Sequence, residues 1–508
     1  MFCNKKNVNI LTAHLLAAGI EDAVVCPGSR NAVIVHNLNE CAQTASTTGH
    51  AMRLHPVTDE RSAAFVAIGL WLATRRPIVV CVTSGSALLN LLPGVAEAAY
   101  RHIPLVIVSA DRPARWIGQL DGQTLPQPNA LLPYAPCWDI PEGGNEEAIS
   151  GACSEALGAT TKDGGQPVHI NVPLEEPLFD FSTPLLPTVE DLPKSAAAVL
   201  DTIPTECMQR ILAARHPAVI VGQYEEEAIA ALTTLRRHGW TVFAENISNQ
   251  DVYNDTLTDV DLLVHIGGAL VEKRLKLQLR EMPALTVVRI DETDEIPATF
   301  GHVDFKVKAH PATALAQIAK SLAGTDDAEG SDSLEAEKNA LGIRHIPGIS
   351  ALFVGNSTAV RWTNRNFRVD VPTYCNRGVN GIEGSLSVAA GYSLASAHKT
   401  LCIIGDLSFF YDSNALWNQR LDGRLRILLV NNNRGGIFYR LPGLNASPAL
   451  DDYIAAQHAN EARGIAESYR CTYLHTVSAN LVSDIDALVE RLLNEPSERP
   501  VILEISTE

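Results

Sequence analysis

The stretch TLCIIGDLSFFYDSNALWNQRLDGRLRILLVNNNR, residues 400–434, decides the fold. Two apolar runs, TLCIIGD and RILLVNN, flank a segment that reads as a helix. This strand–helix–strand pattern predicts two parallel strands joined by one crossover. Asp406 and Asn433 follow the two runs. Because the carboxyl ends of parallel strands meet at one edge of a sheet, both side chains are expected at that edge, where ligands bind.

The residue types at this edge fit a magnesium ion that is bound to phosphate. Magnesium prefers hard oxygen ligands and keeps phosphate oxygens as partners. Asp406 offers a carboxylate oxygen, Asn433 an amide oxygen and Gly435 a backbone carbonyl. Leu407 and Ser408 are expected to open a helix whose free N–H groups suit a phosphate. The alternative is a helix cap followed by a polar turn, since Asp, Asn and Gly favour such places.

The alternation of apolar runs and helical patterns continues along the chain. It predicts an α/β fold with parallel sheets that are covered by helices on both faces. The further expected strands are DAVVCP, PIVVCV, PLVIVSA, PVHINVP, PAVIVG, DLLVHIG, LTVVRID and PVILEIS.

Two changes of composition divide the chain into three segments. Residues 179–194 are rich in proline and lack helical periodicity, and residues 323–338 are acidic and nearly free of large apolar groups. Both stretches predict linkers. The expected domains are residues 1–182, 195–322 and 340–508.

The first and third segments resemble each other. Residues 77–112 and residues 400–434 follow the same order of strand, turn, helix, strand and polar loop. The segments also close alike, with GGQPVHINVP and SERPVILEIS. Units of this kind are common, so the likeness could be incidental. The matching ends favour two copies of one α/β unit on either side of a central α/β domain.

Charge and composition exclude several classes of protein. The net charge of −18 opposes non-specific binding to nucleic acid, and an anionic substrate would need a local cluster of arginines. No stretch has the roughly 20 uninterrupted apolar residues of a membrane span. The first residues lack the apolar block of a signal peptide. The ten cysteines are scattered without a C-x-x-C pair, which favours reduced, buried thiols and a cytoplasmic protein.

The GD-x-S element followed by N-N-x-G resembles the signature of thiamine-diphosphate enzymes. The resemblance implies a pyrimidine-binding, a central and a diphosphate-binding α/β domain. It also implies thiamine diphosphate held through Mg²⁺, with Mn²⁺ as an alternative. The residues implied at the cofactor are Gly405, Asp406, Leu407, Ser408 and Asn433, and the metal ligands are Asp406, Asn433 and Gly435.

Enzymes of this family use a glutamate from the first domain, which is hydrogen-bonded to the aminopyrimidine ring of the cofactor. The matching residue in HPVTDERSAAFVAIGLWLAT is Glu60, at the start of an expected amphipathic helix. The alternative is an acid that merely complements the helix dipole. The cofactor is the electron sink of decarboxylation. The family assembles as dimers in which Glu60 would reach the partner's cofactor, so a homodimer or homotetramer is implied.

Motifs along nearly the whole chain resemble the 2-succinyl-5-enolpyruvyl-6-hydroxy-3-cyclohexene-1-carboxylate synthases of the menaquinone pathway. This resemblance implies decarboxylation of 2-oxoglutarate and a Stetter-like 1,4-addition of the succinyl-semialdehyde carbanion to isochorismate. The motifs are CPGSRNAVI, TDERSAAF, SADRP, EKRL, VGNSTAVR, NRGVNGIEG, GDLSFFYDSNAL and NNNRGGIF.

These two substrates each carry two carboxylates, which arginine recognises well in a planar, bidentate manner. Each basic residue has a plain alternative as surface charge, Lys273 above all. The resemblance implies catalytic roles, besides Glu60, for Ser29, Arg30, Gln123, Ser357, Arg361 and Arg377, and substrate binding by Arg112, Lys273 and Arg274.

Four apolar residues are implied at the cofactor. Ile382 would bend thiamine diphosphate into its V shape, and Ile437, Phe438 and Leu441 would form an apolar wall that also contacts substrate. The alternative for all four is ordinary core packing.

Other functions stay open at this point. The segment VGQYEEEA follows the first strand of the central domain and is not a G-x-G-x-x-G fingerprint, so neither flavin nor NAD is expected there. An acetolactate-synthase-like carboligase acting on pyruvate is the nearest alternative, and the many carboxylate-binding residues oppose it. A non-catalytic cofactor-binding relative is another, because fold does not establish activity.

Overall fold

The computed structural model describes residues 1–43, 52–190, 202–226, 228–250, 257, 259–282, 284–293, 297–323 and 343–507. The chain divides into two compact units, Met1–Ala196 with Gly378–Glu508, and Ala197–Arg377. The predicted domain boundaries at 195, 340 and 508 and most of the predicted second linker, 324–338, lie outside the described residues.

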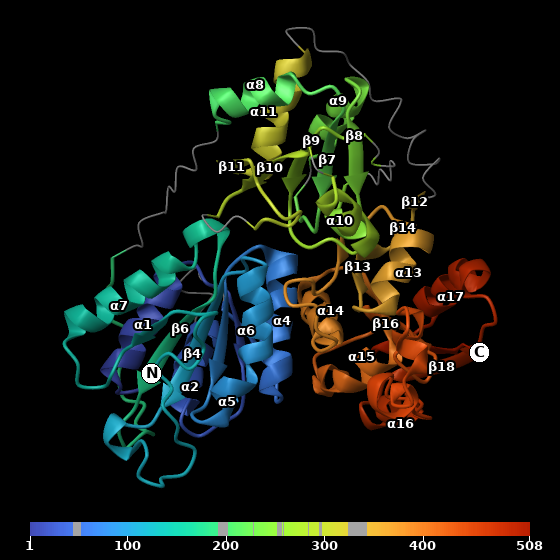
Figure 1. Cartoon of the computed structure of the whole chain (residues 1–508). Coiled ribbons are helices and arrows are strands. Elements are labelled where there is room, and N and C mark those ends of the chain that lie inside the picture. Colours follow the sequence, from blue (N-terminus) through green and yellow to red (C-terminus); the bar gives the residue numbers. More distant parts are fainter. Residues whose placement is uncertain are drawn as a thin grey trace. The chain divides into compact units, whose positions relative to one another are not determined.

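The first unit contains a six-stranded parallel sheet built from the N-terminal part of the chain (Figure 1). Side chains alternate between the two faces of a strand, so Val79 and Cys81 of β3 share a face, as do Val106 and Val108 of β4. All four pack with helices in one hydrophobic core, which holds the sheet against those helices. In sheet order its strands are β2 (Arg53–Pro56), β1 (Asp22–Val25), β3 (Ile78–Val82), β4 (Leu105–Asp111), β6 (Val168–Pro173) and β5 (Cys137–Asp139). Its helices are α1 (Lys6–Ala17), α2 (Ala32–Gln43), α4 (Glu60–Thr74), α5 (Ser86–Asn90), α6 (Leu92–Tyr100) and α7 (Glu146–Ala159).

The C-terminal part of the same unit repeats this arrangement. Four parallel strands run in the order β16-β17-β19-β18, which matches the order β3-β4-β6-β5 of the first sheet. The predicted internal repeat is therefore present in the order of the strands. The strands are β16 (Lys399–Gly405), β17 (Leu425–Asn431), β18 (Thr472–Val477) and β19 (Val501–Ser506), and the helices are α14 (Ser385–Ala395), α15 (Asp406–Tyr411), α16 (Arg463–Ser468) and α17 (Leu481–Asn494).

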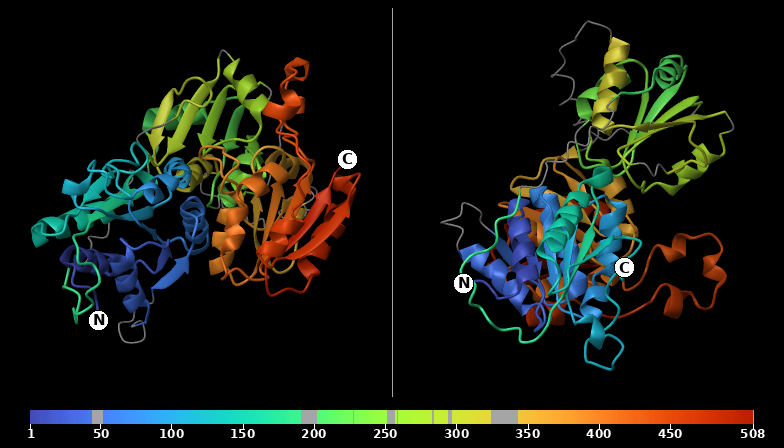
Figure 2. Two further views of the ribbon diagram at one scale, coloured as in Figure 1. Left: turned by 90° about the horizontal axis from the view of Figure 1, so that it is seen from below. Right: turned by 90° about the vertical axis from the view of Figure 1, so that its left-hand side faces the viewer.

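The second unit has a five-stranded parallel sheet, whose strands lie side by side in the left view of Figure 2. Alternation along one strand explains why helices cover both faces: Val219 and Val221 pack with α8, α9 and α11, while Ala218 and Ile220 pack with α10. In sheet order the strands are β11 (Phe305–Lys308), β10 (Thr286–Asp291), β9 (Leu262–Ile266), β7 (Pro217–Val221) and β8 (Thr241–Ala244). The helices are α8 (Thr205–Leu212), α9 (Ile229–Arg237), α10 (Lys273–Arg280) and α11 (Pro311–Ala323).

The remaining elements are short. The second unit also contains β12 (Ile343–Arg344), β13 (Ile349–Val354), α13 (Thr358–Asn366), β14 (Arg368–Val369) and β15 (Thr373–Tyr374), with the parallel pairs β12–β14 and β13–β15. Short 3₁₀ turns lie at Ala114–Trp116, Lys162–Gly164, Asn246–Ser248, Ser413–Trp417, Phe438–Arg440 and Leu444–Ala446, and a π turn lies at Leu450–Ile454.

Every strand that was predicted from an apolar run is present, and the predicted parallel α/β class is confirmed. The strands that were not predicted include the edges β2, β5, β8, β11 and β18. Two expectations about helices were wrong. Helix α4 is not amphipathic, because both of its sides are buried between the sheet and other helices. Helix α15 begins at Asp406 itself, not at Leu407.

The predicted first linker has neither a helix nor a strand over its described part, residues 179–190. It is tied to the N-terminus by backbone hydrogen bonds, from Phe2 N to Thr183 O at 2.7 Å and from Asn4 N to Asp180 O at 2.9 Å. Residues 191–194 lie outside the described residues. All ten cysteines are free, and all but Cys137 and Cys471 are buried, as expected. Among the helices of the described part, none has the length and apolar character needed to cross a membrane.

Helices α4 and α14 approach each other so closely that glycine is required at the contact. A Cβ on Gly69 would overlap the carbonyl oxygen of Val388, and a Cβ on Gly391 would overlap the carbonyl oxygen of Val66. Both obstacles are backbone atoms, which cannot rotate away. The contact therefore fixes the separation of the two halves of the first unit.

Replacing Gly391 by alanine should force α4 and α14 apart. We expect a loss of stability of about 1–3 kcal/mol, the usual effect of overpacking, and a lower thermal unfolding midpoint. The matched control is Gly151→Ala on α7, where a Cβ meets nothing within 4 Å. That control should be neutral or stabilising by up to about 1 kcal/mol. Equal midpoints for the two variants would contradict the required close approach.

Asp412 ties the end of α15 to the start of α14 through a fully buried carboxylate. It accepts hydrogen bonds from the N–H and the hydroxyl of Ser387, both at 2.7 Å. Burial raises the pKa of Asp412 to about 6, although the Ser387 hydrogen bonds and the Arg61 charge act in the opposite direction. The folded protein therefore disfavours the ionised form.

Asp412 should make the fold less stable as the pH rises. Its ordinary pKa is 3.8. Because of Asp412, the free energy of unfolding should fall between about pH 4 and pH 6. The fall is on the order of 3 kcal/mol by pH 7. Asp412→Asn should remove this part of the pH dependence of the thermal midpoint, while the exposed control Asp452→Asn should keep it. Identical pH profiles for the wild type and Asp412→Asn would refute the assignment.

Candidate active site

Several of the predicted site residues follow neighbouring strands at the carboxyl edge of the first sheet. Ser29 and Arg30 follow β1, Glu60 follows β2 and Arg112 follows β4. Ser29 is exposed, whereas Arg30 is only 5% exposed. Arg30 donates from Nη1 to the Leu174 carbonyl at 3.2 Å and pairs through Nη2 with Glu176 at 3.1 Å. The surface-charge alternative therefore fails for Arg30.

Glu60 begins α4, and Asp59 is the N-cap, accepting from the Arg61 N–H at 2.9 Å. The Glu60 carboxylate is half-buried and accepts from Asn90 Nδ2 at 3.3 Å. The pKa of the Cys26 thiol is raised, chiefly by burial and then by the charge of Glu60. The Glu60 carboxylate therefore lies near Cys26, the residue that follows β1. Glu60 and the turn that carries Ser29 and Arg30 thus lie in one neighbourhood.

The loop that carries Arg112 and Gln123 is anchored by a buried polar network. Gln127 accepts from the Gly85 N–H at 2.7 Å and donates to Asn171 Oδ1 at 2.9 Å. Gln123 is exposed with a φ of 55°, and its backbone lies 3.2 Å from the position of a Cβ on Gly85. Arg112 pairs with Asp121 at 3.1 Å. The network holds the loop, although neither predicted side chain belongs to it.

The decisive motif forms as predicted at the carboxyl ends of β16 and β17, where Gly405 pairs with Val430. The buried Asp406 carboxylate accepts from the N–H groups of Leu407 at 2.7 Å and of Asn432 and Arg434 at 3.1 Å each. The Leu407 N–H is therefore already bonded and does not point free toward a phosphate, as the sequence had suggested. Burial raises the pKa of Asp406, and these N–H groups act against that effect.

The Asn433 turn is held in place by the strand beneath it. Asn433 is exposed, has a φ of 59° and donates its N–H to Asn431 Oδ1 at 3.0 Å. Asn431 in turn donates to Glu504 Oε1 at 2.6 Å. Gly435 is buried, and its carbonyl accepts from the Phe438 N–H at 3.1 Å. A carbonyl oxygen has two lone pairs, so this one retains capacity for a second partner.

His458 is a neighbour of this motif that sequence reasoning missed. Its Nε2 lies 3.5 Å from Asp406 Oδ2 and, in the described part of the chain, has no hydrogen-bond partner although it is buried. Its ring also packs against Phe410. No sequence motif marks this residue, because it reaches Asp406 only through the fold.

The apolar residues predicted at the cofactor are not ordinary core. Ile382, Ile437 and Phe438 are half-buried, and Leu441 is 43% exposed. The carbonyl of Ile382 accepts a hydrogen bond from the Ser408 hydroxyl. The structure thus brings Ile382 to the GD-x-S element.

These residues fit a diphosphate–magnesium group by the chemistry of their donors. One buried carboxylate, one amide on an exposed turn and one backbone carbonyl are hard oxygen ligands. A single carboxylate is enough because a diphosphate brings its own negative charge. Half-buried apolar side chains lie beside them for the organic part of a cofactor.

The second unit gathers a separate group of predicted residues. Ser357 follows β13 and Arg377 follows β15, so the two motifs come from neighbouring parallel strands. Arg377 is 7% exposed and donates to Asn356 Oδ1 and to the Leu270 carbonyl, both at 3.1 Å. Arg361 is half-buried and donates to the Ser357 carbonyl at 2.6 Å. The surface-charge alternative fails for Arg377.

Lys273 and Arg274 start α10, and both are exposed, so their surface-charge alternative survives. The segment before them is fixed by Glu245, which is fully buried. Its carboxylate accepts from the N–H groups of Val271 and Glu272 at 2.7 Å each. Sequence reasoning missed Glu245, since an isolated glutamate after a short strand carries no motif.

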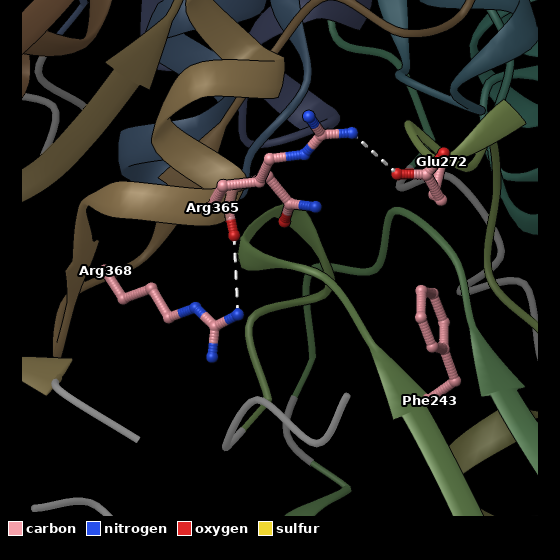
Figure 3. A pocket seen from close by; sticks show the side chains of 5 residues that line it. Phe243, Glu272, Arg365 and Arg368 are labelled. Carbon is pink, nitrogen blue, oxygen red and sulfur yellow. Dashed lines mark hydrogen bonds and ion pairs between the residues drawn. The ribbon is translucent and has the colours of Figure 1, made fainter. Parts of the chain in front are cut away.

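A pocket of about 280 Å³ lies near the start of α10 (Figure 3). Arg365 pairs across it with Glu272 at 3.2 Å, and Arg368 Nη2 donates to the Asn364 carbonyl at 3.4 Å. Phe243 completes the lining. No predicted site residue lines this pocket, but the ion pair connects α13 to the N-cap of α10.

Two family models match the chain. The thiamine pyrophosphate enzyme N-terminal TPP-binding domain matches residues 6–130, and the corresponding C-terminal TPP-binding domain matches residues 354–505. Both matched ranges contain the predicted cofactor residues, Glu60 in the first and Asp406 and Asn433 in the second.

Relatives of one name align along the full chain. The 2-succinyl-5-enolpyruvyl-6-hydroxy-3-cyclohexene-1-carboxylate synthase of Phocaeicola vulgatus is 37% identical, with 100% of this chain and 96% of the relative covered. The protein of that name from Bacteroides thetaiotaomicron is also 37% identical, with 99% and 96% covered. The one from Desulfotalea psychrophila is 33% identical, with 99% and 98% covered. The chain therefore belongs to the 2-succinyl-5-enolpyruvyl-6-hydroxy-3-cyclohexene-1-carboxylate synthase family of thiamine-diphosphate-dependent enzymes.

Proposed function

We propose that this chain decarboxylates 2-oxoglutarate and adds the remaining four-carbon unit to isochorismate in a Stetter-like 1,4-addition. The product is 2-succinyl-5-enolpyruvyl-6-hydroxy-3-cyclohexene-1-carboxylate, in menaquinone biosynthesis. The observation that carries this proposal is the similarity over the full chain to relatives that bear the name of this product. Neither the pyruvate alternative nor the non-catalytic alternative has an observation in its favour.

The cofactor is held, in this proposal, at the edge formed by β16 and β17. Asp406, Asn433 and the Gly435 carbonyl are the proposed ligands of Mg²⁺, for which Mn²⁺ could substitute. Gly405, Leu407 and Ser408 are the proposed cofactor neighbours beside Asp406, although the Leu407 N–H is bonded to Asp406 and is not itself a proposed donor to the diphosphate. When bound, thiamine diphosphate supplies the electron sink that decarboxylation requires. The three N–H groups on Asp406 orient its carboxylate before any metal arrives.

Glu60 is the proposed acid of the reaction. Its carboxylate would hold a proton shared with the aminopyrimidine ring. The N-cap Asp59 fixes the start of the helix, and Asn90 orients Oε2. In the described part of the chain this carboxylate accepts from Asn90 Nδ2 at 3.3 Å, and it keeps acceptor capacity for a ring N–H.

The carboxylates of the two substrates are assigned to the polar and basic residues. Buried guanidinium groups are strong and geometrically defined partners for carboxylates, and Arg30 and Arg377 are both buried. The proposed catalytic contacts are Ser29, Arg30, Gln123, Ser357, Arg361 and Arg377, and the further substrate contacts are Arg112, Lys273 and Arg274.

Apolar side chains complete the proposed site. Ile382, beside Ser408, would set the bent shape of the cofactor. Ile437, Phe438 and Leu441 would form a wall that excludes water from the carboxylate that is lost. Their partial exposure leaves apolar surface for a ligand to cover.

The proposal extends to assembly and location. We infer a homodimer or homotetramer in which Glu60 reaches the partner's cofactor, and domains at residues 1–182, 195–322 and 340–508. A cytoplasmic location is supported by ten cysteines that are all free.

Glu60→Gln should abolish the coupled reaction. With 2-oxoglutarate, isochorismate, Mg²⁺ and thiamine diphosphate, we expect isochorismate consumption to fall on the order of 10²-fold or more, since proton transfer by the acid is lost. The exposed matched control Glu490→Gln on α17 should react as the wild type does. Wild-type rates in Glu60→Gln would remove the acid from the mechanism. Carbon dioxide release from pyruvate but not from 2-oxoglutarate would refute the substrate assignment.

Asp406→Asn should weaken the loading of metal and cofactor before any turnover. The change keeps the size of the side chain but removes the one charged metal ligand. We expect the Kd for thiamine diphosphate, titrated at fixed Mg²⁺ by calorimetry, to rise by more than the roughly 10- to 100-fold that outer-shell changes produce. Glu60→Gln should keep the metal dependence of binding. An unchanged Kd in Asp406→Asn would place the metal elsewhere.

A further inference from the structure

Three cations of the second unit converge on one place. Lys276 on α10 donates from Nζ to the Leu270 carbonyl at 3.4 Å, and Arg377 Nη2 donates to the same oxygen at 3.1 Å. Arg361 on α13 lies nearby, since its charge acts on Lys276 and the charge of Arg377 acts on Arg361. Two like charges therefore share one acceptor, with a third beside them.

The carboxylates around this group are already engaged elsewhere. Glu245 uses its two oxygens on the N–H groups of Val271 and Glu272. Glu272 uses one oxygen on the Arg274 N–H and the other on Arg365, the pair drawn in Figure 3. Within the described residues, no carboxylate forms an ion pair with Lys276, Arg361 or Arg377.

The charge of Glu245 reaches Lys276 and Arg361, but within the described residues it forms an ion pair with neither. Lys276 is half-buried, and burial, followed by the charge of Arg377, lowers the pKa of its ammonium. Arg377 is more than nine-tenths buried, and its Nε has no hydrogen-bond partner in the described structure. The buried Asn376 Nδ2 lacks one as well. Buried donors without acceptors are unfavourable, and a bound anion would supply the missing acceptors.

We propose that Lys276 is a third cationic residue of the carboxylate-binding site that contains Arg361 and Arg377. This inference rests on the proposed function, in which those two arginines bind substrate. The ligand is the carboxylate of a dicarboxylic acid such as 2-oxoglutarate. Nothing in the sequence marks Lys276, which follows the buried Leu275 in an ordinary helix, KRLKLQLR.

The test is direct binding of glutarate, which has the two carboxylates of 2-oxoglutarate without its oxo group. The full chain, loaded with thiamine diphosphate and Mg²⁺, is titrated by calorimetry as wild type, Lys276→Met, Lys276→Arg and Lys320→Met. Lys320 is an exposed lysine on α11 and serves as the matched control. Loss of one charged contact should raise the glutarate Kd of Lys276→Met about tenfold. Lys276→Arg should recover part of the affinity, and Lys320→Met should match the wild type.

Steady-state kinetics separate a binding role from a structural one. Lys276→Met should raise KM for 2-oxoglutarate or isochorismate and leave kcat near the wild-type value. Glutarate binding by Lys276→Met as tight as in the wild type, or no glutarate binding by the wild type, overturns the inference. Lys276-dependent glutarate binding without isochorismate consumption would uphold Lys276 and refute the proposed reaction instead.

Discussion

The close approach of α4 and α14 is the constraint on which the first unit depends. Gly69 and Gly391 place backbone against backbone, and Gly384 just before α14 leaves no room for a Cβ beside the Phe65 ring. Glu60 stands at the start of α4, and Ile382 lies just before α14. The absence of side chains at these contacts thus determines how closely the start of α4, with Glu60, approaches the segment before α14, with Ile382. Dense packing of this kind transmits small changes of volume, so residues far from the chemistry set its geometry.

In both units, buried carboxylates hold backbone segments in place by accepting hydrogen bonds from their N–H groups. Glu97 accepts from the N–H groups of Gly378 and Val379, Glu245 from those that precede α10, and Asp412 from the start of α14. Burying a charge is unfavourable unless it is hydrogen-bonded, and charge-assisted bonds to backbone N–H groups are strong. Each carboxylate therefore fixes a segment next to predicted site residues: Glu97 the chain leading to Ile382, and Glu245 the start of α10.

Features that depend on a local sequence pattern could be predicted. Contacts that form only when distant parts of the chain meet could not. Apolar runs located the inner strands, because strands buried on both faces read as continuous hydrophobic stretches. The edge strand β18 was not predicted, because its side chains are all half-buried or exposed. Asp406 and Asn433 were found because a crossover of fixed length joins them. Lys276 and His458 were not predicted, because their contacts arise from the fold and no spacing in the sequence indicates them.

In the second unit, an ion pair with a carboxylate distinguishes other arginines from the arginine of the proposed carboxylate-binding group. Arg365 and Arg289 are arginines like Arg377, but the first pairs with Glu272 and the second with Asp291. A chain with a net charge of −18 has carboxylates in excess, so the positive charge of this group is a local feature. The overall field would repel a dicarboxylate at long range, while a local cluster with unsatisfied donors attracts it at short range. Under the proposed function, such a group of cations would favour acids that carry two carboxylates.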